Sequence, residues 1–187
     1  MWDLKPRLEG RIVTLEPLRI EHREALLEAA RPTEAWDWWS VDMSTPAAVE
    51  AWLQSSLEAA ERGERAPFAT LDSTSGRAIG STSFMTLHPE HATLEIGWTW
   101  LSPSAWNGGA NIEAKLLMLR HAFAVLGCQR VEFVTHERNE RSRRCRRSLR
   151  GSSASTASSG TARAARARSS RSSTASGRRS RSISRPA

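Results

Sequence analysis

The sequence predicts one α+β domain over residues 1–144, followed by a segment that does not belong to the folded part. Runs that alternate apolar and polar residues interleave with runs of helical spacing in the first 144 residues, which also hold all eight Trp. Residues 145–187 hold 11 Arg, no Lys, no acid and no aromatic residue. Of these 43 residues, 39 are Ser, Arg, Ala, Gly or Thr, so the composition changes abruptly near Cys145.

The overall net charge of +7 is the sum of an acidic domain and a basic tail. Residues 1–144 carry 16 Lys and Arg against 20 Asp and Glu, a net charge of −4. This distribution does not indicate a uniformly basic nucleic-acid-binding domain, whose positive charge lies on the folded face. A domain of this length can bury a core of its own.

Cysteine usage and hydropathy indicate a cytoplasmic protein that does not contact a membrane. Cys128 and Cys145 make no disulfide framework, and Cys128 is expected to be a buried thiol. No apolar run approaches the length of a membrane span, and residues 1–10 lack the apolar core of a signal peptide. No spacing predicts a metal site, and His121 and His136 are expected to be structural. Abundant Arg and Ala with few Lys suggest a GC-rich bacterial genome.

The first 61 residues predict one strand and two helices. Residues 11–18 alternate apolar and polar side chains, as strands do. Residues 20–30 have the spacing of a helix whose apolar face holds Ile20, Leu26, Leu27 and Ala30. A loop over residues 33–45 follows. Thr45 and Pro46 then have the residue types of a cap and a first turn, which predicts a helix to about residue 61.

The next 75 residues predict three strands, a helix and a further strand. The three strands lie at residues 66–72, 78–86 and 92–101, and a loop covers residues 102–108. The helix at 109–126 has core spacing at Ile112, Leu116, Leu117, Leu119 and Phe123. A strand at 129–135 follows it, and the segment ERNERSRR starts another helix.

A glycine loop between a strand and a helix is the first chemical signal. The strand at 92–101 contains LEIGWTW, and the loop at 106–111 is WNGGAN. Backbone N–H groups at such a helix start can bind a phosphate. The loop lacks the Lys-Ser/Thr of a P-loop and the G-x-G-x-x-G of a dinucleotide fold, so alone it is more typical of an ordinary turn.

Together with its neighbours, this unit resembles the GNAT acetyltransferases, in the branch that acetylates the N-terminal amines of ribosomal proteins. The resemblance covers residues 5–144 and rests on LEIGWTWLSPSAWNGGANIEAKLLMLRHAF, on RVEFVTHERN, and on Asn139 and Ser142 in an Asn-x-x-Ser pattern. It implies the acyl-CoA N-acyltransferase fold, an α+β three-layer arrangement whose mixed, mostly antiparallel sheet is flanked by helices. It also implies acetyl transfer from acetyl-CoA to a primary amine, without a metal.

The resemblance also implies where acetyl-CoA binds. A cleft would open between the strands at 92–101 and 129–135, and the thioester would lie beside Asn139 and Ser142. The pantetheine would pair with backbone at Ile96, Gly97, Trp98 and Thr99. The pyrophosphate would lie on Asn107, Gly108, Gly109, Ala110 and Asn111.

The chemistry needs few side chains. An amine must be neutral to attack a thioester, so a carboxylate base is useful, and Glu95 is the candidate. Its alternative role is that of a solvated or paired strand acid. Ser142 is the candidate for protonating the CoA thiolate, and its alternative role is a hydroxyl at a helix start. Backbone N–H groups near Gly97 or Trp98 would hold the thioester oxygen. The chain has no Tyr, which excludes the tyrosine acid of other GNAT branches.

Two features are not settled by the resemblance. The phosphate loop of the family usually begins with Arg or Gln and has a second small residue after its glycine, whereas Trp106 and Asn111 stand here. The loop therefore departs from the family's phosphate-binding pattern at both of these positions. The loop tryptophans Trp36, Trp38 and Trp39 either line the substrate side, as this loop does in the family, or pack a helix against the sheet, which we favour.

The tail departs from the family. After Ser142 the family continues with a helix and two further strands, whereas Arg/Ser/Ala-rich sequence without acids is expected to be disordered. A shifted reading frame near residues 143–147 explains this. Codons allowed for residues 154–160, read in another frame, include Phe-Asp-Gly-Ile-Leu-Arg. Those for 169–178 allow Phe-Ser-Val-Ile-Asp-Ser-Glu-Trp-Pro, and both strings resemble the lost strands.

The composition leaves two other function classes open. The tail, with its 11 Arg, would bind RNA or DNA phosphates non-specifically, with the folded part as a platform. Alternatively, the domain binds acyl-CoA without catalysis. The sequence does not identify the amine acceptor or the oligomeric state.

Overall fold

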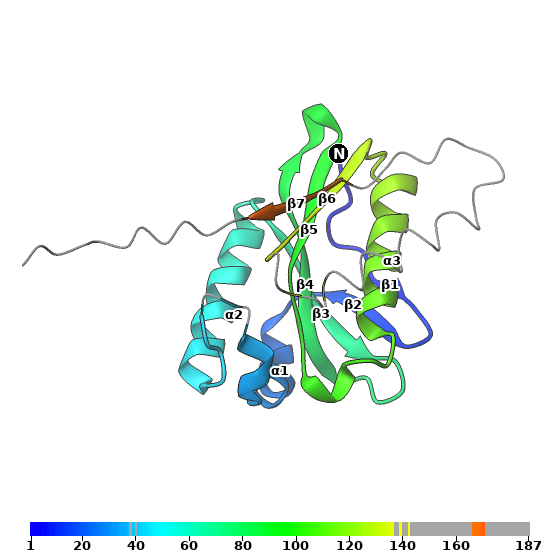
Figure 1. Cartoon of the computed structure of the whole chain (residues 1–187). Coiled ribbons are helices and arrows are strands. Elements are labelled where there is room, and N and C mark those ends of the chain that lie inside the picture. Colours follow the sequence, from blue (N-terminus) through cyan, green and yellow to red (C-terminus); the bar gives the residue numbers. More distant parts are fainter. Residues whose placement is uncertain (38, 40, 137–138, 140–141, 143–165, 171–187) are drawn as a thin grey trace, which may run out of the picture.

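The computed structural model describes residues 1–37, 39, 41–136, 139, 142 and 166–170. In this part of the chain, seven strands form one sheet in chain order (Figure 1). The strands are β1 (Leu8–Glu9), β2 (Val13–Pro17), β3 (Ala66–Asp72), β4 (Ala78–His88), β5 (Thr93–Leu101), β6 (Arg130–His136) and β7 (Arg166–Ser170). Neighbours from β1 to β5 are antiparallel, whereas β5–β6 and β6–β7 are parallel. The predicted mixed, mostly antiparallel sheet is confirmed.

Helices cover both faces of the sheet, which gives the three layers that were predicted. Helices α1 (Arg23–Ala30) and α2 (Pro46–Glu61) lie on one face, and α3 (Ala110–Ala124) lies on the other (Figure 1). Each face has its own buried cluster. The cluster under α3 includes Phe68, Phe84 and Ile96. The cluster under α1 and α2 includes Trp36, Trp52 and Trp100.

The long elements begin and end close to where the sequence predicts. The hydroxyl oxygen of Thr45 accepts a hydrogen bond from the Ala48 backbone N–H at 3.3 Å, so Thr45 caps α2 as expected. The sequence missed the two-residue strand β1 and merged a short 3₁₀ helix, Ile20–His22, with α1. Ile20 is therefore exposed rather than part of the helix face.

The core face of α3 differs from the prediction. The large residues at the predicted core positions (Ile112, Leu116, Leu117, Leu119 and Phe123) are only partly buried and pack around the edge of the contact. The residues that lie fully against the sheet are Ala110, Ala114, Met118 and Ala122. Small side chains on this face let the helix backbone approach the sheet closely, and large side chains then fill the flanks.

Two single-residue expectations are confirmed. Cys128 is a buried free thiol, and burial raises its pKa to about 11, so it is unreactive near neutral pH. His121 is structural: its Nε2 lies 2.7 Å from the Asp3 carbonyl oxygen, and its ring stacks on Phe84. The side chain of His136 lies outside the described residues.

Strand β7 corrects part of the expectation for the tail, because residues 145–187 were expected to take no part in the sheet. Arg166–Ser170 pairs with β6 from Glu132 to His136. Strand pairing uses backbone groups, so an unpaired sheet edge can recruit a segment whose side chains could build no core. The domain boundary expected at residue 144 and the rest of the tail lie outside the described residues. The same holds for the helix expected from Glu137, of which only Asn139 and Ser142 are described. Among the described helices, none is long and apolar enough to cross a membrane.

Glu113 on α3 fastens the N-terminal segment to the helix. Its carboxylate accepts hydrogen bonds from the backbone N–H groups of Arg11, Ile12 and Val13, at 3.0, 2.6 and 2.8 Å. A side chain at Gly10 would place its Cβ 2.5 Å from a Glu113 oxygen, so glycine is needed there. Burial alone would raise the pKa of Glu113, but the three donors outweigh it and hold the pKa below its ordinary value.

We therefore predict that Glu113→Gln lowers the free energy of unfolding by about 1–2 kcal/mol at neutral pH, because an amide has one acceptor oxygen where the carboxylate has two, so at least one of the three bonds is lost and the others lose their charge. A lowered carboxyl pKa stabilises the fold above the unfolded pKa, and this stabilisation is lost as the pH falls through the folded pKa. The difference between the variant and the parent should thus shrink in acid. Urea unfolding at pH 7 and pH 3 measures it, with exposed Glu58→Gln as the control. A constant difference across this range would contradict the assignment.

Candidate active site

Strands β5 and β6 part where the resemblance places the cleft. Their ladder contains only the pairs Thr93–Arg130, Leu94–Val131 and Glu95–Glu132. Beyond Glu95, β5 continues to Leu101 and β6 to His136, and the described residues form no further pair between them. The backbone of β5 on this side is thus available to a ligand that lies between the two strands.

A β-bulge begins at Trp98, three residues beyond Glu95 on β5. Ser83 of β4 pairs with Gly97 and Ser81 pairs with Trp100, so Thr82 alone opposes the two residues Trp98 and Thr99. Trp98 has the left-handed φ of +49°, which is rare for a bulky residue. The bulge interrupts the ladder with β4 and turns backbone N–H groups near Gly97 and Trp98 out of the regular pattern.

A buried polar group of side chains holds the bulge from the α3 side. The hydroxyl oxygens of Thr82 and Thr99 lie 2.8 Å apart, and Thr99 also donates to the Gly97 carbonyl at 3.3 Å. Lys115 of α3, which is only 7% exposed, donates from Nζ to Thr99 Oγ1 at 2.5 Å. The same ammonium lies 5.5 Å from the ring centroid of Phe133 on β6. Lys115 therefore reaches both strands where they part.

Glu95 lies on the face of β5 that points away from α3, because its neighbours Leu94 and Ile96 pack into the α3 cluster. It is half-buried, and Thr86 Oγ1 donates to its Oε2 at 3.3 Å. A Cβ at Gly97 would come within 3.0 Å of Glu95 Oε1 and 2.6 Å of Met85 Sδ. The glycine thus leaves room for the carboxylate beside the bulge.

The pKa of Glu95 is raised above its ordinary value. Burial is the largest cause, and the charge of Glu132, its partner on β6, raises the pKa further. The hydrogen bond from Thr86 and the charge of Lys115 act in the opposite direction. A carboxylate with a raised pKa is a better proton acceptor near neutral pH than an ordinary one.

The glycine loop leads into the N-terminus of α3 as predicted. Asn107 and Gly109 have φ values of +64° and +84°, and Asn107 and Gly108 are exposed. Gly109 occupies the N-cap position without a side-chain cap, so the first N–H groups of α3, from Ala110 onward, need acceptors from elsewhere. Asn111 is half-buried, and its buried Oδ1 has no hydrogen-bond partner among the described residues.

Asn139 and Ser142 are brought together, although their surroundings lie outside the described residues. Asn139 Oδ1 accepts a hydrogen bond from the Ser142 backbone N–H at 3.1 Å. This contact has the geometry of an Asn cap at a helix start. The contact fits a Ser142 hydroxyl that only lies at a helix start. It also fits a hydroxyl that protonates the CoA thiolate, because a capped first turn holds the side chain in one place.

The loop tryptophans have different positions. Trp36 is buried, donates to the Ala30 carbonyl at 2.9 Å and packs on Trp100, so it is part of the core. Trp39 bridges Trp36 and Trp98, with ring centroids 5.7 and 5.6 Å away. Trp38 lies outside the described residues. Trp36 thus has the packing role that we favoured. Trp39, in contrast, contacts the indole ring of Trp98, which is a residue of the bulge.

Sequence reasoning missed two cations of the site, Lys115 and Arg65. Lys115 carried a signal, because it follows Ala114 on the helix face that contacts the sheet, where a charged residue needs a partner. Arg65 carried none, since it precedes β3 in a turn rich in charged residues. Its guanidinium lies over Trp98, with Cζ 4.6 Å from the ring centroid.

The residues present fit acetyl-CoA. The parted strands offer β5 backbone to a pantetheine, the start of α3 offers N–H groups to a pyrophosphate, and Asn111 offers a buried polar atom beside them. In the described part of the chain, no group of three His, Cys, Asp or Glu is placed to hold a metal ion.

Comparisons with known proteins agree with this geometry. Residues 13–150 match the acetyltransferase (GNAT) domain family. A GCN5-related N-acetyltransferase from Brucella melitensis is 30% identical, with a TM-score of 0.70 over 76% of this chain and 66% of its own. A protein from T. thermophilus, assigned as an acetyltransferase, is 39% identical, with a TM-score of 0.69 over 80% of this chain and 77% of its own.

More distant proteins share the fold alone. RimJ from Mycobacterium smegmatis, solved in complex with CoA-disulfide, is 20% identical, with a TM-score of 0.61 over 74% of this chain and 69% of its own. The curated proteins include no match. The family match covers most of the described residues, including the parted strands, the bulge and the glycine loop. The chain therefore belongs to the GNAT acetyltransferase family.

Proposed function

We propose that this chain carries the machinery for transferring an acetyl group from acetyl-CoA to a primary amine by direct attack. The observation that supports this most strongly is the position of Glu95. It is a half-buried carboxylate with a raised pKa, at the last β5–β6 pair and three residues before the bulge. A proton acceptor thus lies beside backbone that can hold a thioester.

Acetyl-CoA supplies a thioester whose carbonyl carbon bonds to the amine nitrogen while its C–S bond breaks, which gives an amide and the CoA thiol. Glu95 takes the proton that the amine must lose. Backbone N–H groups near Gly97 and Trp98 donate to the carbonyl oxygen as it gains negative charge. Ser142 supplies the proton that the sulfur takes up.

The two substrates approach from opposite faces of the sheet in this proposal. The start of α3 would hold the pyrophosphate on one face, with Asn107–Asn111 as the phosphate loop. Glu95 lies on the other face, so the amine comes from the side of α1 and α2. A protein N-terminus or a small amine can enter there past the exposed Trp98.

The tail decides how much of this activity the chain retains. We propose that the segment after Ser142 is out of frame, so that β7, whose side chains are not those of the family's last strands, takes their place beside β6 and turnover is slow. The nucleotide sequence of codons 140–187, read in three frames, tests this. An alternative frame that encodes Phe-Asp-Gly-Ile-Leu-Arg and then Glu-Trp-Pro supports it, and a gene without such a frame refutes it.

We predict that Glu95→Gln lowers kcat/KM by about 10²–10⁴-fold, the usual effect of losing a general base, without weakening acetyl-CoA binding. Rates are measured by thiol release in this chain and in one whose residues after Ser142 follow the alternative frame. Calorimetry measures acetyl-CoA binding, and exposed Glu90→Gln is the control. Unchanged rates in both Glu95→Gln proteins would exclude Glu95 as the base.

The acid limb of the pH profile gives a second prediction. The base must be ionised, so kcat/KM should fall as the pH falls through the pKa of Glu95, which lies above its ordinary value. Glu132→Gln removes a neighbouring negative charge and should move this limb to lower pH. Thr86→Val removes a hydrogen bond that favours the carboxylate and should move it to higher pH. Carbon NMR of the Glu95 carboxyl checks both shifts without turnover, and shifts of the same sign would contradict the account.

A further inference from the structure

Arg65 is a cation on the acceptor side of the bulge that the acetyl-transfer chemistry does not use. It lies between the end of α2 and the start of β3, and its guanidinium stacks on Trp98. Trp98 is 43% exposed although it belongs to the central strand β5. The pair thus forms part of the surface that an incoming amine meets.

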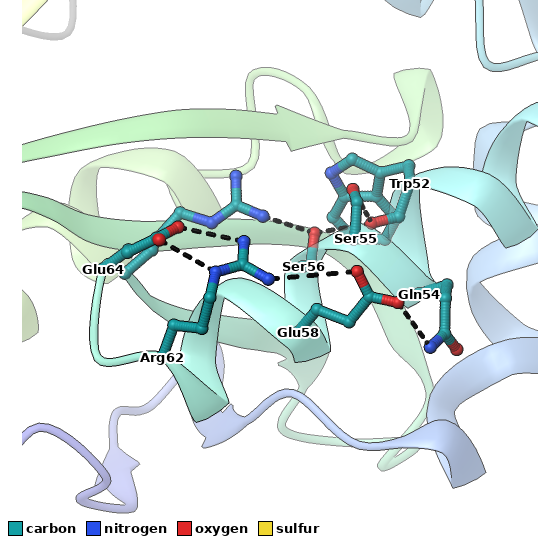
Figure 2. A network of polar contacts seen from close by, with 8 residues as sticks. Trp52, Gln54, Ser55, Ser56, Glu58, Arg62 and Glu64 are labelled. Atoms are coloured by element: carbon teal, nitrogen blue, oxygen red, sulfur yellow. Dashed lines mark hydrogen bonds and ion pairs between the residues drawn. The ribbon is translucent and has the colours of Figure 1, made fainter.

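The guanidinium is held in a fixed plane. Trp98 covers one side of it, and Nη2 donates to the Ser56 hydroxyl at 2.6 Å. Ser56 is fully buried and donates in turn to the Trp52 carbonyl at 2.7 Å, a contact that Figure 2 shows. Stacking and a buried hydrogen bond remove much of the rotamer freedom that a surface arginine would lose on binding.

No carboxylate among the described residues pairs with Arg65. The adjacent acid, Glu64, is bound to Arg62 by two hydrogen bonds of 2.8 and 3.0 Å (Figure 2). Burial lowers the pKa of the Arg65 guanidinium, which stays charged near neutral pH. Arg65 is therefore a half-buried cation whose nearest acid in the sequence is bound to another arginine.

Arg65 itself has an unsatisfied hydrogen-bond donor. Arg65 Nε is buried and has no hydrogen-bond partner among the described residues, and the same holds for the indole N–H groups of Trp52 and Trp100. Trp52 and Trp100 pack against each other, with ring centroids 5.7 Å apart, and the Trp52 carbonyl is joined to Arg65 through Ser56. A half-buried cation that no carboxylate among the described residues pairs with favours an anionic ligand with oxygen acceptors.

We propose that Arg65, stacked on Trp98, binds a carboxylate of the amine acceptor, so that the chain selects acceptors with an acidic group next to the reacting amine. This inference rests on the proposed acetyl transfer, because it assigns Arg65 to the acceptor of that reaction. The planar guanidinium matches the two oxygens of a carboxylate. An N-terminus followed by Asp or Glu carries the two groups in this order.

The test is calorimetry on the full chain with two peptides that differ in one charge. Ala-Asp-Gly-Gly-amide should bind about tenfold or more tightly than Ala-Asn-Gly-Gly-amide, the gain expected of a charged hydrogen bond. Arg65→Met should abolish this preference without changing the affinity for acetyl-CoA. Arg62→Met, which removes a nearby arginine already bound to Glu64, should keep it.

Equal binding of both peptides by the parent chain, or a preference that survives in Arg65→Met, overturns the proposal. If Arg65→Met fails to fold by circular dichroism, Arg65→Lys serves instead: it keeps the charge, loses the planar fork and should reduce the preference. An Arg65→Lys chain with the full preference overturns the proposal too. Peptide discrimination without acetyl-CoA binding would refute the acetyl transfer but leave the anion site standing, and the reverse result would remove only the anion site.

Discussion

The bulge in β5 is the constraint on which the site depends. It adds one residue to a strand that is paired on both sides, and it shifts the faces of all side chains that follow. Before the bulge, Leu94 and Ile96 face α3, and after it Leu101 does so while Trp100 packs under α1 and α2. Because of the same shift, the Trp98 ring lies on the face where it contacts the Trp39 ring and the Arg65 guanidinium. The acceptor side therefore owes its aromatic and cationic groups to one extra residue.

The bulge also links the two halves of the proposed chemistry. Lys115 reaches it from α3 through Thr99, and the same lysine partly offsets the effects that raise the pKa of Glu95. The helix whose N-terminus would hold the phosphates thus also supports the strand that would hold the thioester. Glu113 fastens this helix to the N-terminal segment from its other side. The first turns of α3 are consequently held both to β5 and to the N-terminal segment.

Much of the fold could be predicted from local patterns, since alternating strands, the Thr45 cap and the glycine loop leave signals within a few residues. The bulge could not, because LEIGWTWL alternates regularly and nothing in it reveals an extra residue. Arg65 was missed for a similar reason: its stacking on Trp98 joins two segments that are far apart in the sequence. The α3 core was mispredicted because large apolar residues drew attention away from the small ones that allow close packing. Strand β7 was missed because backbone pairing needs no particular side chains.

The central claim is that acetyl-CoA binds along β5 at the bulge and at the start of α3. Amide NMR of the full chain, titrated with acetyl-CoA, tests it residue by residue. The account predicts saturable shifts in the backbone amides of Gly97, Trp98 and Thr99, together with those of residues 108–111, and little change along β1 to β3. Shifts confined to other surfaces, or no shifts at millimolar acetyl-CoA, would contradict it.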